Sequence, residues 1–122
     1  NIKEFDIPFV CRRLVINNIS LPSYFQIQNL KPWELNHFDT LQWWRFGDFR
    51  SYISLHLLAS VLGVPTSKDD IDGSQVQHVY YIEKNLPRIA TYCQKDVIVV
   101  AQIILRFKNL SLLDSENIFV VS

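Results

Sequence analysis

The segment Leu86–Phe107, LPRIATYCQKDVIVVAQIILRF, decides how this chain folds. It predicts one long helix, with Asn85 as the N-cap and Pro87 in the first turn. Tyr92 and Asp96 lie one turn apart on that helix, and an apolar run follows Asp96 directly. A carboxylate at such a border is costly to desolvate unless a basic side chain or a metal ion lies beside it. The segment therefore predicts either a structural ion pair or a metal ligand at Asp96.

Side chains at helical spacing divide this segment into two neighbouring stripes. The stripe that faces the core is expected to consist of Leu86, Ile89 or Ala90, Cys93, Val97, Val100 and Ile104. The second stripe consists of Tyr92, Asp96, Val99 and Ile103. Tyr92 and Asp96 are therefore expected side by side at the border of the buried face.

The composition fits one globular domain, or part of one. The chain has 122 residues, 48% of them hydrophobic, with 12 basic and 12 acidic side chains. This hydrophobic content excludes a disordered chain, and the zero net charge gives no overall basic signal for nucleic acid. Cys11 and Cys93 have no partner at metal-ligand spacing and are predicted to be reduced packing residues. No signal peptide or membrane span is visible, which predicts a cytoplasmic protein without a membrane partner.

Caps, breakers and periodicity predict the other elements. One helix is expected at Asp6–Asn17 with Asp6 as its cap, and another from a Ser54 cap to Gly63 and Pro65. Strands are expected within Leu35–Phe46, briefly at Phe25–Ile27 in the otherwise irregular Ile19–Pro32, and in the tail Glu116–Ser122, while Pro65–Val76 is expected to be a polar loop. Three amphipathic helices cannot all bury their faces on so little sheet. We therefore expect either a helical bundle or a sheet supplied by residues upstream of Asn1.

The opening NIKEFD places Asn1, Phe5 and Asp6 at the start of the first predicted helix. Together with Tyr-x-x-x-Asp at Tyr92 and Asp96, it resembles the 3′–5′ exonucleases of the DEDD type that carry a tyrosine in their third motif. In particular, the chain is similar to predicted exonucleases related to the proofreading domain of family-B DNA polymerases. The segments HFDTLQWWRFGD and YISLHLLASVLGVPTSKDDIDGSQV stand between the two motifs in the order of that family. The resemblance extends over nearly the whole chain, as far as Phe107.

This resemblance implies an α/β fold of the ribonuclease H-like, DnaQ-like kind. The family's first motif, Asp-x-Glu on the opening strand, is not in the sequence; Asp114 and Glu116 have that spacing at the wrong end and receive no role. We therefore expect residues 1–122 to be the helix-rich C-terminal part of a single exonuclease-like domain, without its N-terminal strands. The role of the tail, residues 109–122, is left open.

The resemblance also implies the chemistry of the site. Asp6 and Asp96 would bind Mg²⁺ or Mn²⁺, two ions roughly 4 Å apart in the complete domain, together with two carboxylates from upstream. Tyr92 would hydrogen-bond the attacking water, and Asn1 and Phe5 would line the path of the terminal nucleotide. The substrate would be the 3′ end of single-stranded DNA, or of RNA, and the product a nucleoside 5′-monophosphate. The fragment itself is expected to be inactive and to self-associate through its apolar helix faces.

Other residues are predicted to be structural. Asp39 is expected to be a structural residue near the sheet, and the scattered histidines lack zinc-ligand spacing. The segment KDDIDG, residues 68–73, lacks the ligands of a calcium loop. Trp43, Trp44 and Phe46 are expected to form a core aromatic cluster rather than to stack on bases. Two other classes stay open: a non-catalytic module that binds nucleic acid or protein, and a purely helical structural protein.

Overall fold

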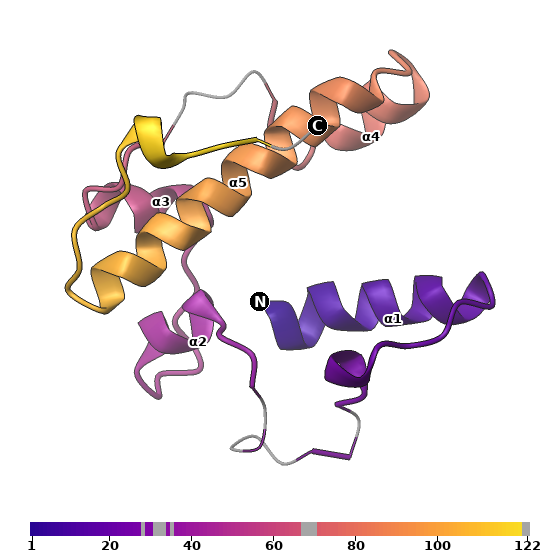
Figure 1. Ribbon diagram of the computed structural model, residues 1–122, viewed down its shortest axis with the longest axis horizontal. Coiled ribbons are helices and arrows are strands. Elements are labelled where there is room, and N and C mark those ends of the chain that lie inside the picture. Colours follow the sequence, from indigo (N-terminus) through magenta and orange to yellow (C-terminus); the bar gives the residue numbers. More distant parts are fainter. Residues whose placement is uncertain (28, 31–33, 35, 67–70, 121–122) are drawn as a thin grey trace. The chain divides into compact units, whose positions relative to one another are not determined.

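The computed structural model describes residues 1–27, 29–30, 34, 36–66 and 71–120. These residues form two compact units, Asn1–Tyr52 and Ile53–Ser122. Every regular element in the described ranges is helical, and none of them is a strand (Figure 1). The first unit contains the π-helix η1 (Ile2–Asp6), α1 (Ile7–Ile16), the 3₁₀-helix η2 (Ser23–Phe25) and α2 (Thr40–Arg45). The second contains α3 (Leu55–Val61), α4 (Val76–Tyr81), α5 (Leu86–Phe107) and the 3₁₀-helix η4 (Ser115–Asn117).

Helix α1 continues directly from η1, so the chain is already helical before Asp6. Asp6 has helical backbone angles, φ −64° and ψ −51°, and its side chain makes no cap hydrogen bond. The predicted helix at Asp6–Asn17 is confirmed, but the prediction that Asp6 caps it is wrong. A side-chain cap requires an extended residue ahead of the helix, and η1 occupies that place.

The strand predicted within Leu35–Phe46 is wrong for the residues that the structure describes; Leu35 itself lies outside them. Asp39 has extended backbone angles, and its carboxylate accepts a hydrogen bond from Leu41 N at 2.9 Å, which starts α2. The left-handed backbone of Phe46, φ 44°, ends the helix. The aromatic, β-prone composition is thus overridden by one N-cap.

The other two predicted strands are also not observed. At Phe25–Ile27, Phe25 is the last residue of η2, and Gln26 and Ile27 have no regular structure. In the surrounding segment, Gln28, Lys31 and Pro32 lie outside the described residues. In the tail, η4 is followed by residues 118–120 without regular structure, and Val121 and Ser122 lie outside the described part. The described residues offer no neighbouring strand with which either segment could pair.

The second unit confirms the predicted helix starts and stops. Ser54 accepts a hydrogen bond from Leu57 N at 3.3 Å to start α3, and Gly63 follows its end with φ +64°. Asn85 accepts from Arg88 N at 3.1 Å to start α5. Helix α4 was not predicted: it occupies the residues directly after the expected polar loop, of which residues 67–70 lie outside the described part.

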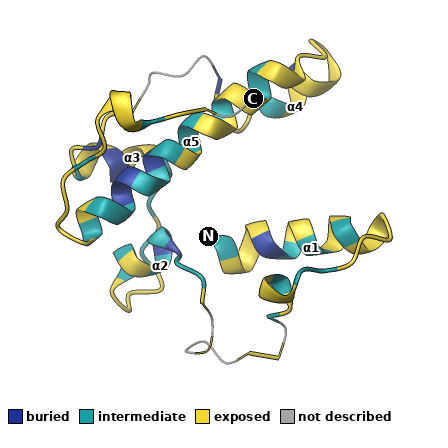
Figure 2. Cartoon of the chain, viewed as in Figure 1, coloured by how far each residue is buried: buried dark blue, intermediate teal, exposed yellow. Residues whose placement is uncertain are grey.

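Buried side chains of the second unit gather where α3 and α4 pack on α5 (Figure 2). They are Leu58, Ala59, Val64, Ile71, Val79, Val99, Gln102 and Ile103. On α5 the buried Val99 and Ile103 belong to the stripe of Tyr92 and Asp96, and the buried Gln102 lies beside it, whereas Val97 is 68% exposed and Cys93 is exposed. The predicted core-facing stripe is therefore wrong, because the buried side chains of α5 lie on and beside the other stripe. None of the described helices is long and apolar enough to cross a membrane.

Candidate functional site

The predicted site residues fall into two groups, one in each unit. Asn1, Phe5 and Asp6 lie at η1 in the first unit, while Tyr92 and Asp96 lie on α5 in the second. Each group is ordered by contacts within its own unit. That the carboxylates of Asp6 and Asp96 meet stays a prediction.

The π-helical conformation of η1 sets the first group apart from an ordinary helix start. Single π-turns are rare in proteins, but those that do occur are often found at functional sites. Phe5, on this turn, is 65% exposed and stacks on Phe9, with ring centroids 6.3 Å apart and an interplanar angle of 12°. The Asp6 carboxylate is exposed and is not used in helix capping. An aromatic face and a carboxylate are thus presented together at the mouth of α1.

Asp39 holds this turn in place. Its carboxylate, 7% exposed, accepts a hydrogen bond from Ile2 N at 3.0 Å, besides the bond from Leu41 N that caps α2. The prediction that Asp39 is a structural residue is confirmed, although the described residues contain no sheet for it to adjoin. Its contact with η1 was missed, because no local signal links residues so far apart in sequence.

The second group lies on the packed stripe of α5. Tyr92 and Asp96 are both half-buried and precede the buried Val99 and Ile103 on that stripe. Asp96 forms no ion pair within the part of the chain that the structure describes. The structural alternative for Asp96, a pair with Lys or Arg, is therefore not observed among these residues.

A tight turn approaches the tyrosine. A Cβ added to Gly73 would lie 3.9 Å from the Tyr92 hydroxyl oxygen, so the turn comes within van der Waals range of the phenol. Asp72 orders this turn by accepting hydrogen bonds from Ser74 Oγ at 2.5 Å and Ser74 N at 2.8 Å. The Ser74 hydroxyl, foremost among these donors, lowers the pKa of the Asp72 carboxyl. No motif in the sequence marks this turn, since KDDIDG, residues 68–73, lacks the ligands of a calcium loop.

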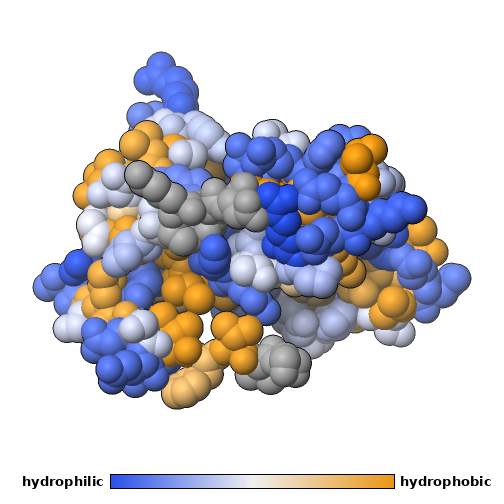
Figure 3. Space-filling view, turned by 90° about the horizontal axis from the view of Figure 1, so that it is seen from above, coloured by the Kyte–Doolittle hydropathy of each residue, from blue (hydrophilic) through white to orange (hydrophobic). Residues whose placement is uncertain are grey.

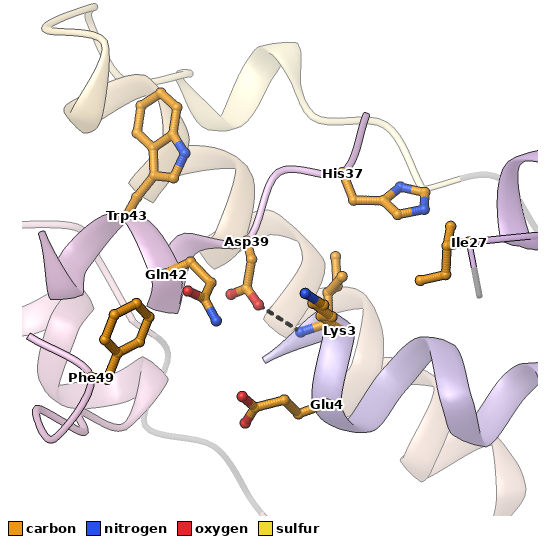
Figure 4. Close-up of a pocket in the computed structure, with 9 residues that line it drawn as sticks. Lys3, Glu4, Ile27, His37, Asp39, Gln42, Trp43 and Phe49 are labelled. Carbon is orange, nitrogen blue, oxygen red and sulfur yellow. Dashed lines mark hydrogen bonds between the residues drawn. The ribbon is translucent and has the colours of Figure 1, made fainter. Parts of the chain in front are cut away.

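The first unit also contains a pocket of about 430 Å³ beside η1 (Figure 4). It is lined by Ile2, Lys3, Glu4, Ile27, His37, Asp39, Gln42, Trp43 and Phe49. Phe46 is 85% exposed and Trp43 is 43% exposed, so the predicted core aromatic cluster of Trp43, Trp44 and Phe46 is wrong. Instead, Trp43 packs on Phe38, with ring centroids 3.7 Å apart.

The donor atoms suit a hard divalent cation, but the described residues do not complete a site. Carboxylate oxygens are the ligands that Mg²⁺ and Mn²⁺ prefer, and the side chains of Asp6 and Asp96 are committed to no cap or ion pair among the described residues. No group of three or more His, Cys, Asp or Glu in these ranges could hold a metal ion. The two aspartates thus fit the role of partial ligands.

The two motifs lie on helical segments in the order that the sequence predicts for a nuclease. The chain belongs to the family of predicted 3′–5′ exonucleases related to the exonuclease domain of PolB, which matches residues 1–117. No curated protein and no solved structure matches this chain.

Proposed function

We propose that this chain is part of a metal-dependent 3′–5′ exonuclease domain that releases nucleoside 5′-monophosphates from the 3′ end of single-stranded DNA or RNA. Its family supports the reaction class. The observation that carries the assignment of residues is Asp96, half-buried on the packed stripe of α5, one turn after Tyr92 and without an ion pair among the described residues. A half-buried carboxylate one turn from a tyrosine, with no basic partner among these residues, suits a metal ligand better than packing alone.

The complete domain, in this proposal, has a ribonuclease H-like α/β fold. Residues 1–122 form its C-terminal part, and an upstream strand supplies the Asp-x-Glu pair. The all-helical character of the described residues is compatible with this arrangement, since the apolar side of a helix in such a fold covers a sheet. Two ions, when bound, would lower the pKa of the attacking water and stabilise the negative charge that develops on the leaving oxygen.

Each residue of this chain has a proposed role that its position allows. Asp96 and Asp6 would hold the cations through carboxylate oxygens. The Tyr92 hydroxyl would orient the attacking water, and α5 would keep the phenol and the carboxylate in register because both lie on one turn of a long helix. The exposed ring of Phe5 would stack on the base or sugar of the terminal nucleotide, with Asn1 beside it.

Cleavage of a 3′-labelled and a 5′-labelled single-stranded oligonucleotide tests this function. We expect a longer form that carries Asp-x-Glu upstream of Asn1 to release mononucleotides from the 3′ end only with Mg²⁺ or Mn²⁺. The 122-residue chain alone is expected to show little or no cleavage, because affinity for Mg²⁺ depends on the number of carboxylates. Binding of the oligonucleotide by the longer form without cleavage would favour the non-catalytic module instead. Efficient cleavage by the 122-residue chain would show that other residues complete the site.

A further inference from the structure

We infer that the pocket beside η1 is a nucleobase subsite, which holds a base of the single-stranded substrate away from the metal ligands. The proposed function indicates that the ligand is a nucleotide, and the pocket indicates where its base would bind. Its volume of about 430 Å³ lies within the range, roughly 300–1,000 Å³, of pockets that bind small organic molecules. Its floor includes Ile2, Lys3 and Glu4, the residues between Asn1 and Phe5. The pocket therefore lies beside the segment whose Asn1 and Phe5 are proposed to line the path of the terminal nucleotide.

Phe49 provides the stacking surface. Its ring is 73% exposed and faces the same open space as the Gln42 amide and the Glu4 carboxylate (Figure 4). An aromatic ring left in water at the wall of a pocket is a surface on which any base can stack. Trp43, which packs on Phe38, is a second aromatic side chain in the lining.

The turn that carries Phe49 is held in shape before any ligand binds. Arg45 Nε donates to Ser51 O at 2.9 Å, Asp48 N donates to Arg45 O at 2.8 Å, and Ser51 N donates to Asp48 O at 3.1 Å. The ring is thus exposed on an ordered turn rather than on a loose loop. Such preorganisation lowers the entropy that binding costs.

The polar side chains favour a base over a phosphate. The lining contains one basic side chain, Lys3, and two carboxylates, Glu4 and Asp39, so the pocket offers no net positive field to an anion. Gln42 and Glu4 carry the amide and carboxylate groups that hydrogen-bond the edges of adenine and cytosine in proteins. His37, which also lines the pocket, lies on the side of Ile27 (Figure 4).

The test measures binding of fluorescent single-stranded oligo(dA) and oligo(A) to the 122-residue chain in EDTA, where cleavage and metal ligation are absent. We expect Phe49→Leu to weaken binding by about 5- to 100-fold, the effect of one lost base stack. Tyr52→Leu is the matched control, since Tyr52 is also 73% exposed and does not line the pocket; its affinity should stay within about twofold of the parent. Thermal melting of both variants checks that they fold.

Competition separates a base from a phosphate and from a protein partner. Adenosine should displace the oligonucleotide from the parent chain, and inorganic phosphate at equal ionic strength should not. Unchanged affinity in Phe49→Leu, displacement by phosphate alone, or no binding by the parent in EDTA would overturn the subsite. A change in sedimentation of Phe49→Leu without a change in oligonucleotide affinity would instead assign this face to contact between copies of the chain. None of these results tests the proposed function, which is tested separately by metal-dependent cleavage by the longer form.

Discussion

Asp39 shows how one side chain organises a region that local propensity would assign differently. Its carboxylate caps α2 and holds the first residue of η1, so one residue fixes two backbone segments. The capping half of this role could be predicted from the sequence, because an N-cap depends on residues two or three positions away. The contact with η1 could not, since it joins residues 37 positions apart.

We expect Asp39→Ala to destabilise the first unit by about 1–3 kcal/mol, because buried backbone N–H groups would lose their acceptor. Urea unfolding followed by tryptophan fluorescence measures this, since all three tryptophans lie in residues 1–52. Asp48→Ala is the control. The Asp48 side chain is 61% exposed and accepts from Arg50 N at 3.2 Å, so its loss should cost clearly less. Equal effects of the two substitutions would contradict the role given to Asp39.

At the scale of elements, the sequence predicts helices with local stop signals best. The caps Ser54 and Asn85 and the turn at Gly63 set the ends of α3 and α5 through contacts within one helical turn. The predicted strands failed because a strand depends on a partner, which the described residues do not contain. The buried face of α5 was assigned to the wrong stripe for a similar reason: both stripes contain large apolar side chains, and only packing against α3 and α4 decides which of them is buried.

The stability of two α5 variants tests which face of the helix is buried. Ile103 is fully buried, so Ile103→Ala should destabilise the second unit by about 2–5 kcal/mol through lost burial and a residual cavity. Val97→Ala, on the stripe first expected to face the core, should change stability by no more than about 0.5 kcal/mol because Val97 is 68% exposed. Far-ultraviolet circular dichroism during chemical unfolding measures both. A larger loss in Val97→Ala than in Ile103→Ala would restore the original assignment.

At the scale of the whole molecule, many large apolar side chains are in contact with water. Phe9, Ile16, Val97 and Phe119 are each more than half exposed, and apolar residues, orange in Figure 3, reach the surface in several places. Exposed apolar area of this kind is typical of surfaces that bind another protein segment. The side chains near Val97 and Phe119 also line a groove of about 220 Å³ between α5 and the tail.

We therefore expect the 122-residue chain to self-associate. Sedimentation velocity over a range of concentrations should show species larger than the 14.3 kDa monomer, and Val97→Lys should shift the distribution towards the monomer. Leu57→Lys serves as a comparison on α3, where the side chain is 55% exposed. A chain that stays monomeric at all concentrations and unfolds cooperatively would show that its apolar surface needs no partner.

The candidate site was predictable in its parts but not in its assembly. NIKEFD and Tyr-x-x-x-Asp could be read from the sequence because each occupies a single helical segment. Whether Asp6 and Asp96 share metal ions, as proposed, depends on how the two units come together, and no local pattern encodes this. The π-helical turn at η1 and the approach of Gly73 to Tyr92 likewise depend on tertiary contacts.

The most direct test of the exonuclease assignment compares Asp96→Asn with Tyr92→Phe in the longer form that carries Asp-x-Glu. Cleavage of a single-stranded oligonucleotide and thermal stability are measured for both variants, with and without Mn²⁺. We expect Asp96→Asn to abolish cleavage, because the amide keeps the shape but loses the charge that binds the cation. Tyr92→Phe should raise the barrier by only ~1–3 kcal/mol, the value of one hydrogen bond to a charged partner.

Thermal stability separates the catalytic from the structural reading of Asp96. If Asp96 lies among other carboxylates, Asp96→Asn should stabilise the metal-free protein and remove the stabilisation by Mn²⁺, because like-charge repulsion is relieved and a ligand is lost. If it is structural, the melting temperature should change while activity per folded molecule stays near that of the parent. An Asp96→Asn protein that cleaves at the parental rate in Mn²⁺ would contradict the assignment of α5 to an exonuclease site.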